Sequence, residues 1–422
     1  MSQQQGAADA DTNFTRAEQW LLLIVGAVQF VNILDFMMVM PMGPDFAKAL
    51  DIPSSHLGQI AASYGIAAAI SGFAASTFLD KFDRRKALAV AMLGLIIGTA
   101  AGGLAWNLPS LIAARVIAGA FGGPATALSI SIVSDTIPVA RRGKAMGRVA
   151  SAFAVASIAG VPLSLSLASR YGWRIPFFFV AALGVVVTTI ALSRMKPMTG
   201  HLTAAANSGQ KVSILDIVGR YESRISLSGS LLVLAGNFAL IPNISSYVQF
   251  NLGYPREALD QLYMVGGVAS FITLFFVGKW VDKYGAPRIA WVGALLYTII
   301  VVLGFVHPVA GIPVLAIFPM FMVASSFRMI ALNTLASRVP AAPERARFQS
   351  AQSAIQQVGS SAGALAAAAY LKEDPKTHAL IGIQAVAYVS LFINFIIPVI
   401  VMALAAQLAR RDRQTAGYPA ID

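Results

Sequence analysis

The sequence predicts an all-α integral membrane protein made of two pseudo-symmetric six-helix bundles. Hydrophobic residues make up 57% of the 422 residues and charged residues only 12%, with a mean hydropathy of +0.70. A soluble domain carries roughly 25% charged residues, so this composition is typical of a chain embedded in a bilayer. The charges are clustered, which leaves uncharged runs of about 20 residues that can cross a hydrocarbon core of about 30 Å as helices.

An internal repeat with an offset of 202 positions predicts the two bundles. LDKFDRRKAL at 79–88 returns as VDKYGAPRIA at 281–290. The same offset carries Pro138 onto Pro340 and Asp35 onto Asn237. A register that is shared at three separated places indicates two fused copies of one membrane unit, an organisation found in transporters.

Each copy supplies six apolar runs, so twelve transmembrane helices are expected. In the first copy the runs cover 20–42, 57–79, 87–106, 109–133, 145–168 and 175–193. In the second copy they cover 225–249, 259–281, 289–306, 312–335, 348–371 and 379–408. The chain therefore divides into an N-terminal half at 1–193, a linker at 194–224 and a C-terminal half at 225–422. Within the linker, a short amphipathic helix is expected near 214–221.

The positions of lysine and arginine predict the orientation in the membrane. If the amino terminus is inside, the outer loops carry only six of the 31 basic residues, namely Lys48, Arg170, Arg174, Arg256, Lys372 and Lys376. This bias places both termini in the cytoplasm of a multi-pass protein, which we expect in a bacterial inner membrane. The same basic segments explain the net charge of +12 without a nucleic-acid partner.

Residue types also limit the chemistry that can be expected. The chain has no cysteine, which excludes disulfides and thiolate metal sites. Its four histidines, all in or near predicted loops, give no support to a metal site. We therefore expect no cofactor, no metal and no enzymatic activity. The expected partners are a small-molecule substrate, protons and the lipid bilayer, and we expect a monomer.

Three motifs carry a resemblance to a known family. STFLDKFDRRK at 76–86 matches the pattern G-x-L-A-D-R-x-G-R-K, LIAARVIAGAFGG at 111–123 matches an R-x-x-x-G span signature, and AGVPLSLSLASRYGWR at 159–174 matches an antiporter signature. With them the chain resembles the major facilitator superfamily, and within it the twelve-span drug and sugar efflux antiporters. Ser76, Asp83 and Ser164 stand where that family usually has glycine.

Asp35 is the candidate for proton coupling, because it is the only acid that lies more than two residues inside a predicted span; Asp260 lies at the very start of another. A lone carboxylate in hydrocarbon costs several kcal/mol unless it is protonated or paired. Asp35 lies six residues before Pro41 and Arg115 six after Pro109, so both sit about 9 Å below the outer boundary at 1.5 Å per residue. The resemblance implies that their spans approach the central cavity, so we expect the two side chains to meet. A static buried ion pair is the alternative.

Polar residues in the spans are the candidates for the substrate cavity. Gln29 and Asn32 precede Asp35 at three-residue spacing, which places all three on one helix face, and we expect this face to look into the cavity. The candidates in the second half are Asn237, Asn243, Tyr247, Arg328, Gln352, Gln356 and Asn394. For each of these, a hydrogen bond between helices is as good an explanation as substrate contact. Arg328 either binds an anionic or polar substrate or extends to the head groups.

The loop motifs are interpreted as a gate. By resemblance, Asp80 lies beside the start of span eleven, near 344–348, and Arg84 bridges Asp80 and Asp135. Such a cluster would hold the cytoplasmic side closed in the outward-facing state. Asp282 and Arg288 form a looser second latch, because Pro287 replaces one basic residue. Charge that only sets topology is the alternative.

These observations favour a proton-coupled exporter of small, partly apolar organic compounds, with drug-like molecules or sugars as the leading classes. Two alternatives remain open at this point. One is a proton symporter that takes up an organic anion, with Arg328 binding the anion. The other is a lipid or lysolipid flippase, which requires a laterally open groove between the halves. A receptor is disfavoured, since no sensory domain is attached.

Overall fold

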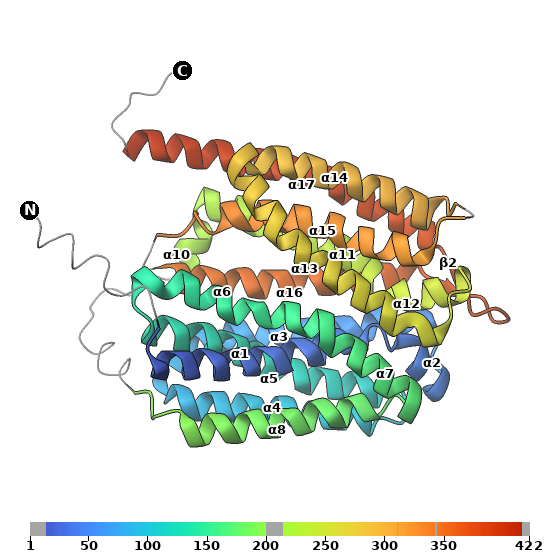
Figure 1. Ribbon diagram of the computed structural model, residues 1–422, viewed down its shortest axis with the longest axis horizontal. Helices are drawn as coiled ribbons and strands as arrows, with labels where there is room; N and C mark the ends of the chain where they lie inside the picture. Colours follow the sequence, from blue (N-terminus) through green and yellow to red (C-terminus); the bar gives the residue numbers. More distant parts are fainter. Residues whose placement is uncertain (1–13, 200–213, 310, 342–343, 416–422) are drawn as a thin grey trace, which may run out of the picture.

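The computed structural model describes residues 14–199, 214–309, 311–341 and 344–415, which form a bundle of long helices (Figure 1). Helices of the first half occupy the lower part of that view and those of the second half the upper part. We call the end of the bundle where α1 begins and α17 finishes the terminal end. The opposite end, where α2 and the strands lie, is the distal end.

The first half contains six crossings of the bundle. Its helices are α1 (Arg16–Val39), α3 (Leu57–Phe78), α4 (Arg84–Gly103), α5 (Leu108–Thr136), α6 (Val139–Val155) continued by η3 (Ala156–Gly160) and α7 (Val161–Tyr171), and α8 (Ile175–Arg194). Shorter elements in the connections are α2 (Gly43–Leu50), η1 (Ser54–His56) and η2 (Leu79–Lys81). The turn η3 is a π-helix, so the fifth crossing is irregular at its centre.

The second half repeats this order after α10 (Ile214–Gly219), which falls within the helix expected in the linker. Its first crossing is α11 (Tyr221–Leu240) with η4 (Ile241–Asn243), α12 (Ile244–Ser246) and η5 (Tyr247–Asn251). Then come η6 (Arg256–Ala258), α13 (Leu259–Tyr284), α14 (Ala286–Val301) with η7 (Val302–Val306), α15 (Val314–Ala336), α16 (Arg345–Tyr370) and α17 (Ile383–Thr415). Strands β1 (Lys372–Glu373) and β2 (Leu380–Ile381) pair antiparallel before α17.

Local signals explain where several helices begin. Thr15 and Glu18 form a reciprocal capping box at the start of α1, which satisfies amides that the first turn leaves without partners. Asn107 and Ser110 do the same for α5. Asp83 accepts hydrogen bonds from the amides of Arg85, at 2.9 Å, and Met198, at 3.0 Å. The aspartate at the usual glycine position therefore caps α4 and holds the segment after α8.

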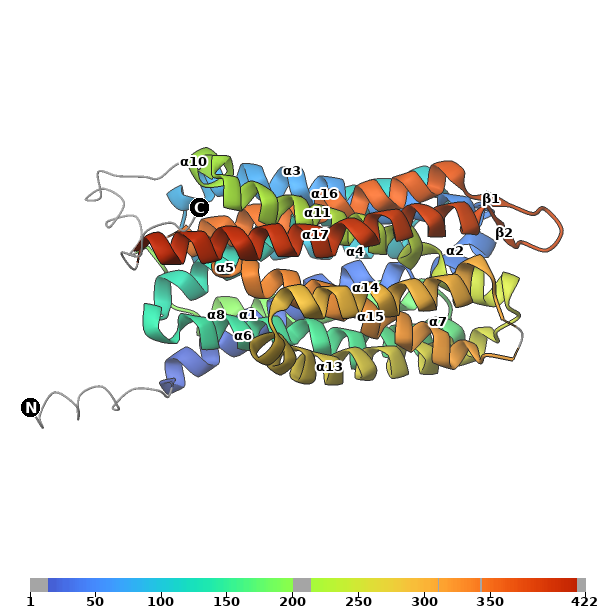
Figure 2. The same cartoon turned by 90° about the horizontal axis from the view of Figure 1, so that it is seen from above.

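Eleven of the described crossings are long and apolar enough to span a membrane, and α16 is the twelfth. The predicted count of twelve is confirmed, with α16 the most polar crossing. This helix packs between α3 of the first half and α11 of the second (Figure 2). A helix surrounded by protein does not need the apolar surface of a lipid-facing one.

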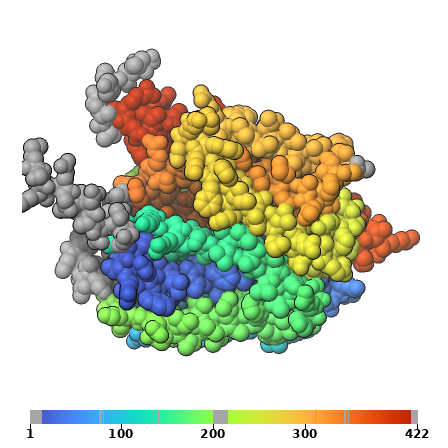
Figure 3. Space-filling view, viewed as in Figure 1, coloured from blue at the N-terminus to red at the C-terminus, as the bar shows by residue number. Residues whose placement is uncertain are grey.

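The two halves meet at the distal end. Ser361 of α16 donates to the carbonyl of Ala62 in α3 at 3.2 Å. In α13, a side chain at Gly267 would collide with the Ser157 carbonyl of η3, so these helices also approach closely. Toward the terminal end, α6 and α13 separate and leave a hollow in the surface (Figure 3). This arrangement closes the distal end and opens the terminal end.

Candidate functional site

Asp35 of α1 and Arg115 of α5 form an ion pair inside the first half. The two terminal nitrogens of Arg115 each donate to a carboxylate oxygen of Asp35 at 3.0 Å, and one also contacts the Asp35 carbonyl at 3.3 Å. Asp35 is 0% exposed and Arg115 is 1% exposed. The expected contact is therefore present, in the parallel geometry that gives arginine and carboxylate their strongest pairing.

Other side chains complete the environment of this pair. Thr99 of α4 donates its hydroxyl to Asp35 at 2.7 Å. The Arg115 guanidinium lies over the rings of Tyr64, at 5.7 Å, and Phe177, at 5.5 Å. Its Nε atom is buried without a partner among the described residues. The pair is thus enclosed by helices of the first half, so the expectation that Asp35 faces the cavity was wrong.

A line of hydrogen bonds nevertheless connects the surroundings of the pair with the space between the halves. Tyr64 donates its hydroxyl to the Asn32 side-chain oxygen at 2.7 Å. Asn32 donates to Thr126 Oγ1 at 2.8 Å, and Thr126 Oγ1 lies 3.5 Å from the side-chain oxygen of Gln29. At Gly122 a side chain would strike both Tyr64 and Asn32, so glycine is needed there for this line to form.

Thr126 lies at the wall of a narrow cavity between the two halves. The cavity is bounded by α3, α5 and α16, and its lining consists of Ala68, Gly72, Gly123, Thr126, Ala127, Ile130, Ser350, Ser353, Ala354 and Gln357. Every one of these residues is uncharged. The polar ones are hydroxyls and one amide. The cavity has a volume of only about 20 Å³, enough for about one water molecule, so it is a constriction between the halves and would have to widen to hold a larger ligand.

A second buried arginine occupies the C-terminal half. Arg328 of α15 donates to the side-chain oxygens of Asn394, at 2.9 Å, and Asn237. Its guanidinium lies 3.5 Å from the ring centre of Tyr297, whose hydroxyl shares a hydrogen bond of 2.7 Å with Ser390. Arg328 is 0% exposed, so it does not extend to the head groups, and that alternative is excluded.

The two arginine clusters use corresponding helices of the repeat. Arg115 reaches from the fourth crossing to Asp35 in the first, and Arg328 reaches from the tenth to Asn237 in the seventh. Asp35 and Asn237 are related by the offset of 202 residues. Among the side chains that the structure describes, Arg328 makes no ion pair with a carboxylate. One half therefore holds an ion pair, and the other holds a cation solvated by amides.

Comparisons with known proteins agree with this architecture. The sequence profile of the Major Facilitator Superfamily matches residues 25–364 and 226–420. The chain belongs to this superfamily. It is therefore a multi-pass membrane transporter rather than an enzyme.

Individual relatives are distant. The chain is 24% identical over 291 residues to the uncharacterized MFS-type transporter YbcL of Bacillus subtilis, covering 67% of the chain and 72% of the relative. It is 26% identical over 279 residues to a chloramphenicol resistance protein of Streptomyces lividans, covering 65% and 70%. For the multidrug resistance protein fnx1 of Schizosaccharomyces pombe, identity is 29% over 206 residues, covering 48% of the chain and 35% of the longer relative.

Solved structures share the fold at low sequence identity. A D-xylose-proton symporter superposes with a TM-score of 0.72 and 17% identity, covering 90% of the chain and 96% of the symporter. A bacterial homolog of the human lysosomal transporter Spinster gives a TM-score of 0.71 and 15% identity, covering 93% and 98%. The predicted twelve-helix fold is thereby confirmed.

The other candidate cavity residues of the transporter divide into two groups. Tyr247 donates to the Gly304 carbonyl at 2.8 Å and Asn243 to the Ala239 carbonyl at 3.3 Å. Both are buried inside the second half, so neither side chain lines the cavity in this structure. Gln352 and Gln356 are half-buried on α16, and Gln352 donates to Ser230 and Asn333 at 3.2 and 3.1 Å.

The gate residues are only partly brought together. Arg84 Nε lies 3.1 Å from an oxygen of Asp135, as expected from the loop motif. Of Asp80 only the backbone is described, so its predicted contacts fall outside the described side chains. Asp282 and Arg288 are exposed and share no ion pair. The chain turns at Gly285, with a φ of 85°, and leaves these two side chains on separate helices.

The sequence analysis missed the contacts that close the distal end. Arg256, the first residue of η6, donates to both oxygens of Asp45 in α2, at 2.6 and 2.5 Å. Glu373 of β1 accepts from the amide of Ser54 in η1 and lies 2.5 Å from His378. These contacts join the two halves through loops, where no helix periodicity marks the partners. Thr126 could have been found, because it is the repeat partner of Arg328.

Proposed function

We propose that this transporter exports small, partly apolar organic compounds in exchange for protons. The observation that carries the proposal is the buried Asp35–Arg115 pair. The Arg115 guanidinium lies over the ring of Tyr64, and the Tyr64 hydroxyl starts the hydrogen bonds through Asn32 to Thr126 at the wall of the cavity. An ionisable pair in a membrane is costly and usually marks an ion pathway. Relatives named for chloramphenicol and multidrug resistance support export of organic compounds.

Coupling follows because a proton and the Arg115 guanidinium compete for the carboxylate of Asp35. While Asp35 is ionised, it holds Arg115 in place through two hydrogen bonds. A proton on Asp35 removes the charge that Arg115 needs, and the guanidinium then shifts toward the ring of Tyr64. Tyr64 passes this shift to Asn32 and Thr126, so protonation and occupancy of the cavity bias the same helices.

The substrates are neutral rather than cationic molecules. The lining of the cavity carries no acid among its described residues. A bound organic cation would meet no counter-charge there, which disfavours it. If the halves separate and widen this cavity, a neutral compound with hydroxyl or amide groups can form hydrogen bonds with Thr126, Ser350, Ser353 and Gln357.

The proposed orientation places the terminal end in the cytoplasm of a bacterial inner membrane, since the basic loops lie at that end. The hollow between α6 and α13 then admits substrate from the cytoplasm. Closure would use the Arg84–Asp135 pair together with Asp80 at the terminal end. Opening to the outside would require the Asp45–Arg256 pair to break. The transporter works as a monomer in this scheme.

Uptake of an organic anion is the second candidate. Arg328 favours it, because the guanidinium is buried without a carboxylate partner among the described residues. The same burial keeps Arg328 away from the cavity behind Tyr297, Asn237 and Asn394. We therefore propose export as the main function and anion uptake as the second candidate.

Purified protein in liposomes tests the proposal. An imposed pH gradient should drive accumulation of chloramphenicol, used as the neutral probe, and collapsing the gradient with a protonophore should abolish it. Ethidium is the cationic control and should not be accumulated. Accumulation of ethidium but not chloramphenicol would contradict the substrate class, while transport of a neutral probe that ignores the gradient would contradict proton coupling.

A further inference from the structure

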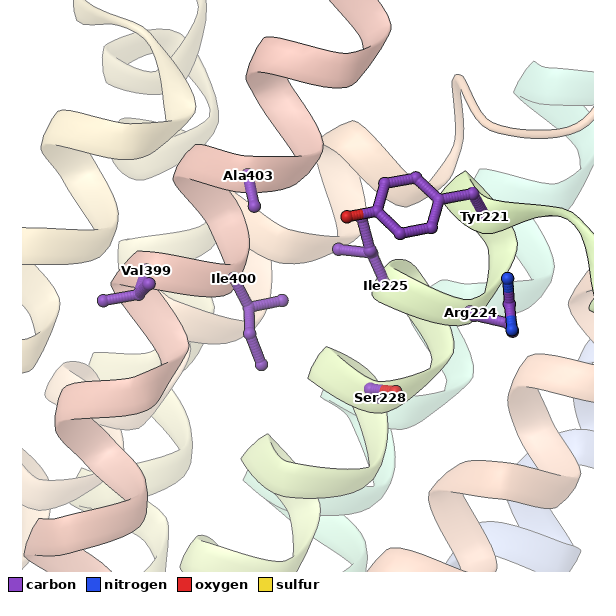
Figure 4. Close-up of a pocket in the computed structure, with 7 residues that line it drawn as sticks. All are labelled: Tyr221, Arg224, Ile225, Ser228, Val399, Ile400 and Ala403. Carbon is purple, nitrogen blue, oxygen red and sulfur yellow. The ribbon is translucent and has the colours of Figure 1, made fainter.

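A hollow of about 410 Å³ lies on the outside of the second half, between α11 and α17 near the terminal end. Its lining is Tyr221, Arg224, Ile225, Ser228, Val399, Ile400 and Ala403 (Figure 4). The α11 residues recur at spacings of three and four, so they form one helix face. Because Tyr221, Arg224, Ser228 and Val399 are exposed, this surface faces the surrounding lipid when the protein is in a membrane.

Arg224 is the unusual member of this surface. No hydrogen bond or ion pair joins its side chain to another residue in the described part of the chain. Arg220, one turn earlier, is instead held by two hydrogen bonds of 2.6 and 2.7 Å to Glu344. A cation on a lipid-facing helix is costly unless it reaches a polar group. Arg224 therefore has a charge available for a partner outside the chain.

The hollow has two chemically different ends. Tyr221 is the first residue of α11, and tyrosine is typical of the head-group level of a membrane. Ser228 lies two turns deeper, about 10 Å along the helix axis, beside Val399 and Ile400. A ligand that fits places an anionic group at Arg224, a hydroxyl contact at Tyr221 and a hydrocarbon chain along the apolar wall.

We propose that this hollow binds one anionic phospholipid of the terminal-end leaflet, with its phosphate on Arg224 and an acyl chain between α11 and α17. Arginine suits the phosphate because its planar donors match two oxygens at once. The anionic head group fits the charge of this end, where α17 also carries Arg410, Arg411 and Arg413 in its last turns. The lipid would brace α11, which bears Asn237 of the Arg328 cluster.

Native mass spectrometry of the purified full-length protein, with dioleoyl phosphatidylglycerol added at rising concentration, measures this binding directly. We expect one lipid to bind more tightly than the rest. Arg224→Gln should weaken that first binding about fivefold, as expected for one arginine near a phospholipid surface. Ala403→Trp, which fills the hollow without changing charge, should also weaken it. Arg288→Gln removes an exposed arginine at the same end, on α14, and should leave it unchanged.

Two further ligands separate the sources of the phosphate. Inorganic phosphate at the same concentration should neither bind detectably nor displace the lipid, since it cannot use the apolar wall. Dioleoyl phosphatidylcholine should bind less tightly than phosphatidylglycerol. The proposal is overturned if Arg224→Gln and Arg288→Gln weaken binding equally, if neither Arg224→Gln nor Ala403→Trp weakens it, or if inorganic phosphate displaces the lipid. Transport plays no part in this measurement, so its result is independent of the proposed function.

Discussion

The Asp35–Arg115 pair makes a prediction about stability that can be worked out from its geometry. Asp35→Asn keeps the size of the side chain and one acceptor oxygen, but it removes the charge from both 3.0 Å hydrogen bonds. Charge-assisted hydrogen bonds contribute about 1.5 to 3 kcal/mol and neutral ones about 0.5 to 1.5 kcal/mol. The free energy of unfolding should therefore fall by about 3 kcal/mol, near the lower limit for breaking a buried pair.

The asparagine variant should still fold, because the second half already holds Arg328 with the oxygen of Asn237. A double variant, Asp35→Asn with Arg115→Gln, removes the stranded cation as well. It should be more stable than Asp35→Asn alone, since much of the cost of the single change is the uncompensated charge. Both variants should lose transport driven by a pH gradient.

Thermal unfolding in detergent, monitored by tryptophan fluorescence, gives the melting temperatures of the wild type and the two variants. The wild type should melt highest, the double variant next and Asp35→Asn lowest. Ser129→Ala is the matched control, because Ser129 is also buried in α5 but bonds only to the Ala125 carbonyl. If Asp35→Asn melts with the wild type, or if the double variant melts lower than the single, the pair does not carry the assigned energy.

Three further predictions address the cavity wall, the distal contact and pH. Thr126→Val should slow gradient-driven transport about fivefold, because it removes the hydrogen bond from Asn32. Thr126→Ser keeps the hydroxyl and should transport at the wild-type rate. If Thr126→Val also transports at the wild-type rate, Thr126 has no part in coupling. Arg256→Gln should favour the distal-open state by about 1 to 3 kcal/mol, seen as faster labelling of cysteines introduced into the distal halves of α3 and α16. The Arg220 guanidinium lowers the pKa of Glu344 from 4.5. The Arg220–Glu344 pair therefore contributes its full free energy to folding above about pH 4.5, and this contribution is lost as the pH falls further. In Glu344→Gln, the melting temperature should therefore fall less than in the wild type as the pH is lowered below this value.

Much of the fold could be predicted because membrane insertion leaves a strong pattern in the sequence. The 202-residue repeat and the apolar runs gave twelve crossings in two halves, which is the observed order. Asp35 and Arg115 could be paired because a lone charge in hydrocarbon needs a partner and both lay at the same depth. Such inferences depend on one strong energy term, the cost of taking a charge or a backbone group out of water.

The parts that failed depend on the rotation of helices about their own axes. Spacing placed Gln29, Asn32 and Asp35 on one face of α1. It could not show that Gln29 lies near the cavity wall while Asp35, two turns further along the same face, is enclosed by the first half. Tyr247 was assigned to the cavity for the same reason, although its hydroxyl bonds inside the second half. Rotation is set by packing with neighbouring helices, which a single sequence does not reveal.

The repeat offers a physical explanation for where the proposed proton coupling would reside. Both halves inherit a polar residue on their first helix and an arginine that reaches it from the fourth, so the arrangement itself is a property of the fold. Only the first half has a carboxylate at that position, because Asn237 replaces the aspartate in the second. An amide does not gain or lose a proton in the physiological range, so in the proposed mechanism the Arg328 cluster keeps one charge state and the carboxylate of Asp35 is the group that takes up the coupled proton. In this mechanism the rocking motion of the two similar halves depends on a proton bound in the first half, because the charge of the Arg328 cluster in the second half stays constant.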